Sequence, residues 1–146
     1  MEISVIPAAS VFMEIADFYK VYSGSQRLEA KDELVVARAH HSFVGSVRLC
    51  QENGLYTLRS MQIADAHQRQ GIGQRILNRF KERLEEKNIP EAFCIPYAHL
   101  EKFYSSIGFQ KIENEQAPEF LQERLKEYSQ RRPETSFIVM KWSRSL

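Results

Sequence analysis

The sequence predicts one α+β domain in which helices pack on the faces of a mixed, mostly antiparallel sheet. Short valine-rich runs separated by turn signals predict three consecutive antiparallel strands in the first half of the chain. Beyond residue 73, apolar runs of strand length alternate with segments whose apolar residues recur every three or four positions, as in helices. The 146 residues are enough for one core, so a single domain over 1–146 is expected.

The first half of the chain is expected to hold one helix and the antiparallel strands. Asn53-Gly54 is a strong hairpin signal because both residues tolerate the positive φ of a type I′ turn. His40-His41-Ser42 separates the two strands of the preceding hairpin, and the polar stretch Gly24–Glu33 is expected to be a surface loop. The expected elements are a strand over Ile3–Ile6, a helix over Ala9–Tyr22, and strands over Leu34–Ala39, Phe43–Cys50 and Leu55–Ile63.

The second half alternates helices with strands. A helix is expected after Gly73, and it stops before Asn88-Ile89-Pro90 because a residue before proline disfavours the helical conformation. One face of this helix is apolar and consists of Ile76, Leu77, Phe80 and Leu84. The later elements expected are a strand over Ala92–Ile95, a helix over Tyr97–Ile107, a strand over Phe109–Ile112, a helix over Glu119–Tyr128 and a strand over Ser136–Trp142.

Composition and charge narrow the kinds of partner. The formal net charge of +1 offers no basic stripe, so neither nucleic acid nor an acidic membrane surface is expected as a partner. The opening stretch MEISVIPAAS lacks the basic segment and apolar core typical of a signal peptide, and no apolar run approaches the ~18–20 residues of a membrane span. Cys50 and Cys94 lie in apolar, strand-like runs and are expected to be buried free thiols of a cytoplasmic protein. No metal is expected, because no ligand cluster surrounds His40-His41.

Gly71 and Gly73 lie one residue apart where the second long helix begins. Unpaired N–H groups at a helix start attract anions, and glycine lets an anion approach the backbone. Arg69 adds positive charge nearby, so a phosphate or pyrophosphate is the expected ligand. Gln74 stands where a Walker loop needs lysine, and Ile76 where a dinucleotide fingerprint needs glycine, so both of those motifs fail.

The remaining pattern, Gln68-x-x-Gly71-x-Gly73, closely resembles the acetyl-CoA-binding motif of the GCN5-related N-acetyltransferase (GNAT) superfamily. The resemblance covers most of the chain and implies the GNAT fold, in which a central sheet of about seven strands, flanked by helices, is splayed between strands four and five. Further segments that resemble the family, in the family's order, are Phe43–Val47, Leu58–Ile63, Phe103–Phe109 and Phe137–Lys141.

The resemblance also implies a function. It predicts an acyl-CoA-dependent N-acetyltransferase that transfers an acetyl group directly from acetyl-CoA to a primary amine of a small-molecule or peptide acceptor. A catalytically silent acyl-CoA-binding or regulatory module of the same fold is the alternative. A homodimer is common in the family, so a second copy of the chain is the other kind of partner to expect.

Individual residues take their expected roles from the same resemblance. Tyr104 matches the tyrosine that protonates the departing CoA thiolate in many members; the alternative for it is a core aromatic. The backbone of Met61 and Ile63 would bind the pantetheine arm, and the amides from Arg69 to Gln74 would hold the pyrophosphate. The expected cofactor-binding residues are Met61, Ile63, Gln68, Arg69, Gln70, Gly71, Ile72, Gly73 and Gln74.

Two departures from the family pattern concern catalysis. Tyr97 stands where many members carry an asparagine that contacts pantetheine. The fourth strand offers Arg59, Ser60 and Gln62 in place of a glutamate general base. An attacking amine must lose a proton, and His99 is the best candidate to accept it because histidine titrates near neutral pH. Local capping or packing is the alternative role for His99.

Overall fold

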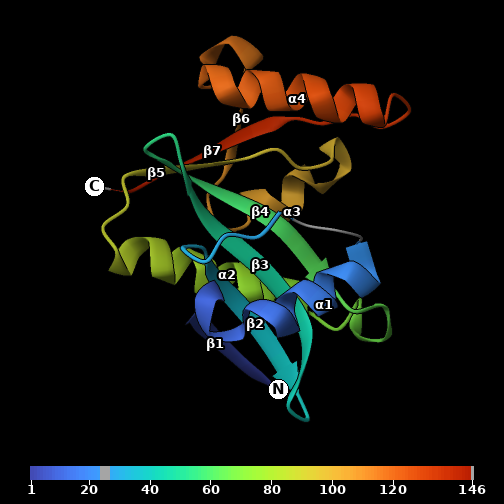
Figure 1. Ribbon diagram of the computed structural model, residues 1–146. Coiled ribbons are helices and arrows are strands. Elements are labelled where there is room, and N and C mark those ends of the chain that lie inside the picture. The colour runs from blue at the N-terminus through green and yellow to red at the C-terminus, as the bar shows by residue number, and fades with distance from the viewer. Residues whose placement is uncertain (24–26, 146) are drawn as a thin grey trace. The chain divides into compact units, whose positions relative to one another are not determined.

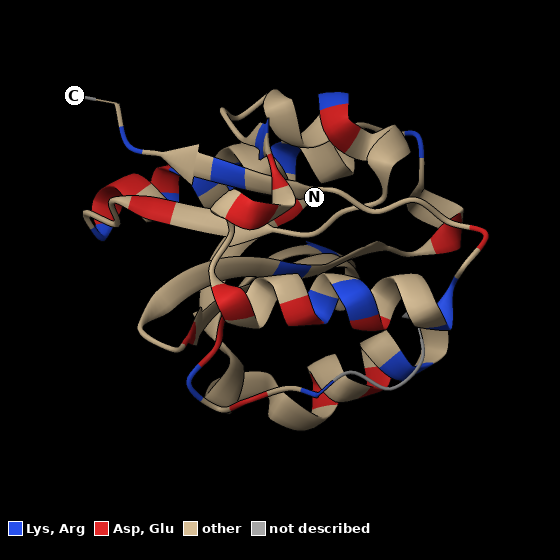
Figure 2. Ribbon diagram, turned by 90° about the horizontal axis from the view of Figure 1, so that it is seen from above, with Lys and Arg blue, Asp and Glu red and all other residues tan. Residues whose placement is uncertain are grey.

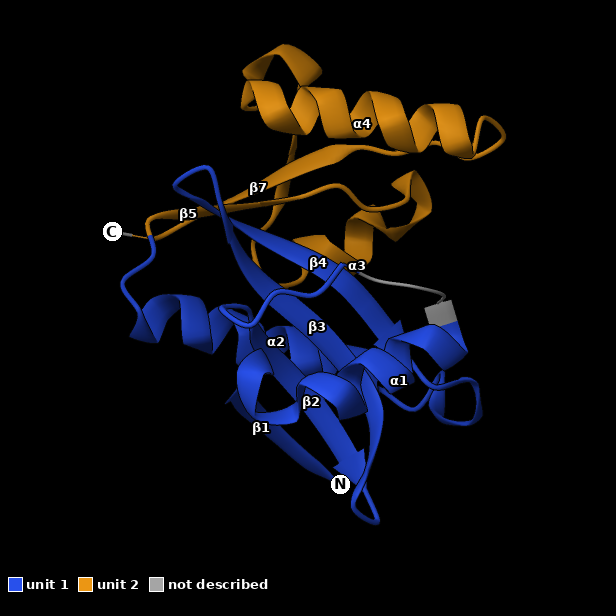
Figure 3. Cartoon of the chain, viewed as in Figure 1, with its two compact units in different colours: residues 1–89 blue, residues 90–146 orange. Residues whose placement is uncertain are grey.

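The computed structural model describes residues 1–23 and 27–145, and the chain divides into two compact units (Figure 3). Unit 1 is Met1–Ile89 and unit 2 is Pro90–Leu146. Unit 1 contains β1 (Glu2–Pro7), a 3₁₀ turn η1 (Ala8–Val11), α1 (Phe12–Ser23), β2 (Glu33–Ala39), β3 (Ser42–Glu52), β4 (Leu55–Ile63), a 3₁₀ turn η2 (Asp65–His67) and α2 (Ile72–Glu86). Unit 2 contains β5 (Glu91–Cys94), η3 (Ala98–Leu100), α3 (Glu101–Ser105), β6 (Gln110–Ile112), η4 (Asn114–Gln116), α4 (Glu119–Arg131) and β7 (Val139–Ser143).

The four strands of unit 1 form an antiparallel sheet in the order β1-β2-β3-β4 (Figure 1). The turn between β2 and β3 has φ values of 53° at His40 and 69° at His41. The turn between β3 and β4 has 50° at Asn53 and 77° at Gly54. Positive φ at both central residues is the property of type I′ turns, whose twist suits antiparallel neighbours. The predicted run of three antiparallel strands is confirmed.

The helices α1 and α2 cover opposite faces of this sheet (Figure 1). Gly45 on β3 faces α2, because a Cβ built there would lie 2.9 Å from Cδ1 of Ile76. The next residue, Ser46, faces α1, and its hydroxyl lies 3.0 Å from that of Tyr19. Successive side chains of a strand point to opposite faces. Most of β3 is therefore buried on both sides.

The apolar face of α2 packs on the sheet as predicted. The helix begins earlier than expected, at Ile72, because the left-handed residue that serves as its N-cap is Gly71, with φ of 78°, and not Gly73. Gly73 therefore lies inside the first turn. The buried residues of α2 are Ile72, Ile76, Leu77, Phe80 and Leu84.

In unit 2, β7 lies between β5 and β6 and pairs antiparallel with both. The single helix expected over 97–107 is wrong in extent, since a 3₁₀ turn over Ala98–Leu100 precedes an α-helix limited to Glu101–Ser105. Leu100 ends the 3₁₀ turn and is the N-cap of α3, with φ of −99° and ψ of 11°, which are not α-helical values.

The surface loop expected over 24–33 is wrong for its last two residues, Asp32 and Glu33. Residues 24–26 lie outside the described residues. Asp32 is only 2% exposed, and Glu33 already belongs to β2. Asp32 is buried because it pairs with a buried arginine of β3, Arg48.

Charges of both signs are interspersed along the helices (Figure 2), as expected for a chain with a formal net charge of +1. Among the described residues, no helix is both long and apolar enough to cross a membrane.

Cys50 and Cys94 are both buried and free, as expected from the sequence. Burial raises the pKa of the Cys50 thiol to about 12, so Cys50 is protonated at neutral pH.

Glu33 connects β2 to the last turns of α2. Its carboxylate accepts a hydrogen bond of 2.7 Å from Nε of Arg83 and a second from the Lys87 ammonium. Burial alone would raise the pKa of Glu33, but the hydrogen bonds from Arg83 and Lys87 outweigh burial and lower it below the ordinary value of 4.5. The charged carboxylate therefore stabilises the folded state above pH 4.5, and this stabilisation is lost as the pH falls through the lower folded-state pKa.

We expect Glu33→Gln to lower the free energy of unfolding at pH 7 by about 1–2 kcal/mol, because two charge-assisted hydrogen bonds are weakened. The difference from wild type should shrink below pH 4.5, where the wild-type carboxyl becomes protonated. Urea unfolding at several pH values measures both effects. Glu14→Gln, at an exposed site on α1, is the control and should change little. A difference that stays constant down to pH 3 would contradict this account of Glu33.

Candidate active site

The loop between β4 and α2 has the backbone geometry of an anion-binding site. Arg69 and Gly71 both have positive φ, of 64° and 78°, and are separated by one residue. Left-handed residues in such a loop turn successive N–H groups toward the same side, which creates a concave anion site called a nest. Gln68, Arg69, Gln70 and Gly71 are all exposed, so an anion can reach this backbone.

The first turn of α2 continues the same surface. No side chain caps the start of the helix, and its first turn contains no acidic residue. The N–H groups of a first turn have no intrahelical acceptor, and the helix dipole adds positive charge there. Apart from Gly71 itself, its two chain neighbours and the nearby helix backbone, no described atom lies within 4 Å of the Cβ position at Gly71. These properties fit a pyrophosphate held by the backbone of residues 69–74.

The side chains of this loop have mainly structural contacts. Nε2 of Gln68 donates to the carbonyl oxygen of Ile63 at 3.1 Å, which ties the loop to the end of β4. The Ile72 side chain is buried against the sheet, so only its backbone is available to a ligand. Nε2 of Gln74 donates to Asn78 at 2.9 Å. The candidate anion site therefore consists of peptide groups, with Arg69 as the nearby cation.

A β-bulge interrupts β4 at Ser60 and Met61. The register of β4 against β3 shifts there, so these two residues together lie opposite Val47. Ser60 has a left-handed φ of 58°. A bulge takes peptide groups out of the regular ladder of hydrogen bonds. The Met61 backbone, which the family resemblance assigns to the pantetheine arm, thus lies within an irregular part of the strand.

A buried polar cluster next to this bulge was missed by the sequence analysis. The available signal was the period of two in β3, which places Ser46 and Arg48 on one face of an otherwise apolar strand. Polar residues two apart in a buried strand need partners inside the protein. The members of the cluster are Tyr19, Asp32, Ser46, Arg48 and Ser60.

Tyr104, in unit 2, combines a buried ring with an available hydroxyl. It is 5% exposed, and its ring packs edge-on against Phe103 and Phe109, with centroid distances of 5.0 and 6.4 Å. No hydrogen bond of its hydroxyl is found among residues 1–23 and 27–145. Burial, with a smaller contribution from Cys94, raises the pKa of Tyr104 well above its ordinary value. Tyr104 is therefore protonated at neutral pH and has a proton to donate.

His99 is exposed and lies in the 3₁₀ turn before α3. Its ring stacks on Tyr97 with a centroid distance of 5.6 Å and an interplanar angle of 13°. Tyr97 also contacts Phe137, and its hydroxyl accepts a hydrogen bond of 2.9 Å from Arg132. Within the described part of unit 2, no hydrogen bond or ring contact joins His99 to Tyr104.

The antiparallel strands of unit 1 and the glycine loop before α2 are features that the resemblance to the GNAT family predicts. The family model of the acetyltransferase (GNAT) domain matches residues 9–141. The chain belongs to this family, which confirms the family and the fold class predicted from the sequence. The expected splay between the fourth and fifth strands stays a prediction.

Solved structures with the same fold have low sequence identity to this chain. Escherichia coli ElaA has a TM-score of 0.70 and 13% identity, over 97% of this chain and 99% of that one. Rv2747 from Mycobacterium tuberculosis, solved with CoA, has a TM-score of 0.70 and 17% identity, over 97% and 99%. N-acetylglutamate synthase from Neisseria gonorrhoeae, solved with coenzyme A and N-acetyl-glutamate, has a TM-score of 0.68 and 11% identity; all of this chain covers 36% of that one. No curated protein matches the chain.

We expect Gly71→Val to abolish measurable CoA binding while the protein stays folded. The branched side chain would occupy the open space beside the nest, where the pyrophosphate is expected to approach the backbone. Calorimetric titration with CoA measures the affinity, and circular dichroism confirms folding.

Gly54→Val is the matched control for Gly71→Val. Gly54 has nearly the same φ, 77°, equally open surroundings, and a position in the hairpin turn between β3 and β4. Both variants place a β-branched residue in the left-handed region, which costs about 1–2 kcal/mol. Gly54→Val should lose this stability and keep its CoA affinity. Equal affinities in the two variants would refute the anion site.

Proposed function

We propose that this chain is an acetyl-CoA-dependent N-acetyltransferase that transfers an acetyl group to a primary amine of a small-molecule or peptide acceptor. The observation that carries the proposal is the uncapped, unobstructed backbone at Gly71 and the first turn of α2, in a chain of the GNAT family. CoA complexes among proteins of the same fold support this choice of ligand. Met61, Ile63 and residues 68–74 are the proposed acetyl-CoA contacts.

Direct transfer of the acetyl group from acetyl-CoA to the amine gives a role to β4, Tyr104 and His99. The amine nitrogen attacks the thioester carbon, a backbone N–H of β4 stabilises the developing oxyanion, and the C–S bond then breaks. Tyr104 gives its proton to the departing sulfur, and the proton lost by the amine goes to His99 or to water. No covalent enzyme intermediate is needed. The protonated, buried thiol of Cys50 therefore has no role as a nucleophile.

The location and the partners form part of the proposal. Cys50 and Cys94 are both free, which suits a reducing compartment, and we place the protein in the cytoplasm on this basis. The acceptor amine comes from a small molecule or a peptide, and a second copy of the chain is the proposed protein partner.

The proposal is tested by titrating the protein with CoA and then assaying thiol release from acetyl-CoA with a panel of primary amines. Binding followed by amine-dependent release supports the transferase. Binding with no release for any amine, including polyamines, amino acids, aminoglycosides and peptides, would favour the catalytically silent acyl-CoA-binding module instead.

We expect Tyr104→Phe to lower kcat about 10²-fold, because the leaving thiolate loses its proton donor. CoA affinity should change little. The ring keeps its packing against Phe103 and Phe109, so the fold is maintained. Tyr128→Phe, which removes a hydroxyl from α4 in the same unit, is the control. A kcat within twofold of wild type for Tyr104→Phe would leave Tyr104 as a core aromatic only.

If His99 accepts the amine proton, kcat/KM should show an acidic limb near neutral pH that disappears in His99→Gln. Glutamine keeps the polarity and approximate size of the side chain and does not titrate. If the acidic limb comes from ionisation of the acceptor amine, its midpoint should instead shift with the pKa of the amine and stay the same in His99→Gln. Profiles for two amines of different basicity separate these cases, and an unchanged limb in His99→Gln rejects His99.

A further inference from the structure

Ser60 adopts a backbone conformation that a strand residue does not take by itself. Its φ of 58° lies in the left-handed region, which costs a residue with a Cβ about 1–2 kcal/mol. Such a conformation persists only where the surrounding structure imposes it. Two buried side chains from other segments of unit 1, Tyr19 and Arg48, bind Ser60 directly.

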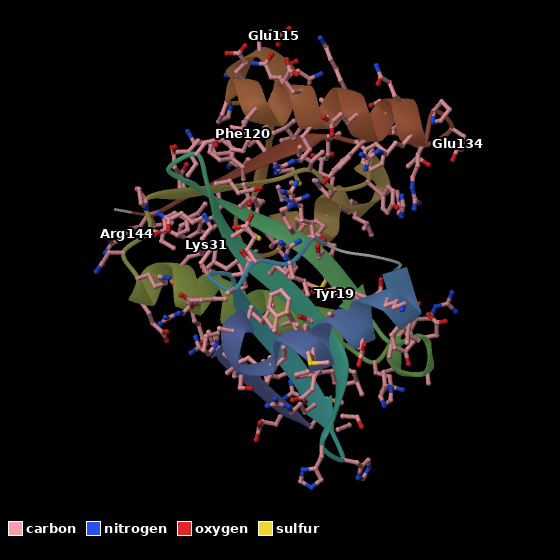
Figure 4. The ribbon with its side chains drawn as sticks, in the orientation of Figure 1. Tyr19, Lys31, Glu115, Phe120, Glu134 and Arg144 are labelled. Carbon is pink, nitrogen blue, oxygen red and sulfur yellow. The ribbon has the colours of Figure 1, made fainter. Side chains whose placement is uncertain are left out.

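Tyr19 holds the main chain of Ser60. Figure 4 labels the Tyr19 side chain on α1. Its hydroxyl donates a hydrogen bond of 2.7 Å to the Ser60 carbonyl oxygen. The ring is fully buried and packs edge-on against Phe18 at a centroid distance of 5.5 Å. Burial raises the pKa of Tyr19 well above its ordinary value, so the hydroxyl keeps its proton. A carbonyl oxygen can only accept a hydrogen bond, so the Tyr19 hydroxyl proton points at the carbonyl oxygen of Ser60. The Ser46 hydroxyl lies 3.0 Å from the Tyr19 oxygen and therefore donates its own proton to that oxygen.

Arg48 holds the side chain of Ser60. Its Nη1 donates to the Ser60 hydroxyl at 3.1 Å. The other side of the guanidinium is fixed by Asp32, at 3.2 Å from Nε and 2.8 Å from Nη2, and by the carbonyl oxygen of Arg27 at 2.8 Å. A buried guanidinium bound on both sides has little freedom to move. Arg48 therefore links the segment before β2 to the bulge of β4.

These contacts fix the direction of one peptide group. The Ser60 carbonyl and the Met61 N–H belong to the same trans peptide, so they point in opposite directions. When Tyr19 fixes the carbonyl, it also fixes the N–H of Met61. A hydrogen bond to the carbonyl polarises the peptide as well and makes its N–H a better donor.

We propose that Tyr19 and Arg48 are positioning residues for acyl transfer, which hold the Ser60–Met61 peptide so that the Met61 N–H donates a hydrogen bond to the thioester oxygen of acetyl-CoA. This inference rests on the proposed function and deepens it. When the amine attacks the thioester carbon, the C=O electron pair moves onto this oxygen, and the hydrogen bond from Met61 strengthens without transfer of its proton. Tyr19 and Arg48 act through the peptide and contact neither the amine nor the sulfur.

The first test compares Tyr19→Phe with wild type. Phenylalanine keeps the buried ring and removes the hydroxyl, so it takes away both the donor to Ser60 and the partner of the Ser46 hydroxyl. We expect kcat to fall about tenfold, the size expected when one buried carbonyl loses its partner, while the Kd for CoA stays within twofold. The infrared carbonyl frequency of bound ¹³C-acetyl-CoA should shift toward the value of the free thioester. Tyr56→Phe, at the far end of β4 beside Lys87, is the matched control and should leave all three measurements unchanged.

The second test uses the left-handed backbone itself. Ser60→Gly and Ser60→Ala both remove the hydroxyl bound by Arg48, but only glycine adopts positive φ without steric cost. We expect Ser60→Gly to retain a higher kcat and a lower carbonyl frequency of bound acetyl-CoA than Ser60→Ala. The opposite order is expected in an ordinary strand, where glycine is the more harmful residue.

The outcomes separate this inference from the proposed function. The positioning role would be overturned, and the proposed transferase left intact, if Tyr19→Phe changed neither the carbonyl frequency nor kcat. The same conclusion would follow if the kcat of Ser60→Ala equalled or exceeded that of Ser60→Gly. Failure of the wild-type chain to bind CoA would overturn both. The frequency measurement needs no acceptor, so it gives a result even before the amine is identified.

Discussion

The buried charge of Arg48 is the constraint on which the interior of unit 1 depends. Arg48 and Asp32 are both 2% exposed, and an unpaired charge at such a depth would cost several kcal/mol. The guanidinium avoids this cost through hydrogen bonds to Asp32, Arg27 and Ser60. Arg27 and Asp32 lie in the segment before β2 and Ser60 lies in the bulge of β4, so pairing the charge also fixes these two segments around β3. The same requirement explains why a stretch of polar sequence that looked like a surface loop ends inside the protein.

The backbone geometry of the candidate anion site was predictable because it is local. Gly71 and Arg69 take positive φ within one short loop, and the free N–H groups follow from where the next helix begins. The bulge of β4 was not predictable in this way. Its backbone conformation depends on Tyr19, which is 41 residues away in sequence and reaches Ser60 only after α1 packs on the sheet. A pattern within β4 gives no sign of that contact.

The fold shows the same division between local and long-range causes. Asn53-Gly54 determined one hairpin because the turn chemistry of two residues is enough to set the twist. The helix expected over 97–107 followed the apolar period correctly and still missed the break at Leu100, because periodicity reports which face is buried and not whether the backbone stays helical. The burial of Arg48 was not predicted, because the valines and leucine around it make β3 read as an apolar strand. Its position two residues from Ser46 nevertheless places both residues on the face covered by α1.

Three polar side chains of β4, those of Arg59, Ser60 and Gln62, are engaged by the protein itself, and this decides what kind of chemistry they can supply. Arg59 binds Glu52 at 3.1 Å, the Ser60 hydroxyl accepts from Arg48, and Nε2 of Gln62 donates to the carbonyl oxygen of Ile63 at 2.9 Å. A side chain held in this way is a poor proton acceptor, so a general base on β4 has no candidate among these three. The peptide groups of the bulge are different, because the shift in register removes them from the ladder with β3. We infer that β4 serves the reaction through oriented backbone donors, and that proton removal from the amine falls to His99 or to water.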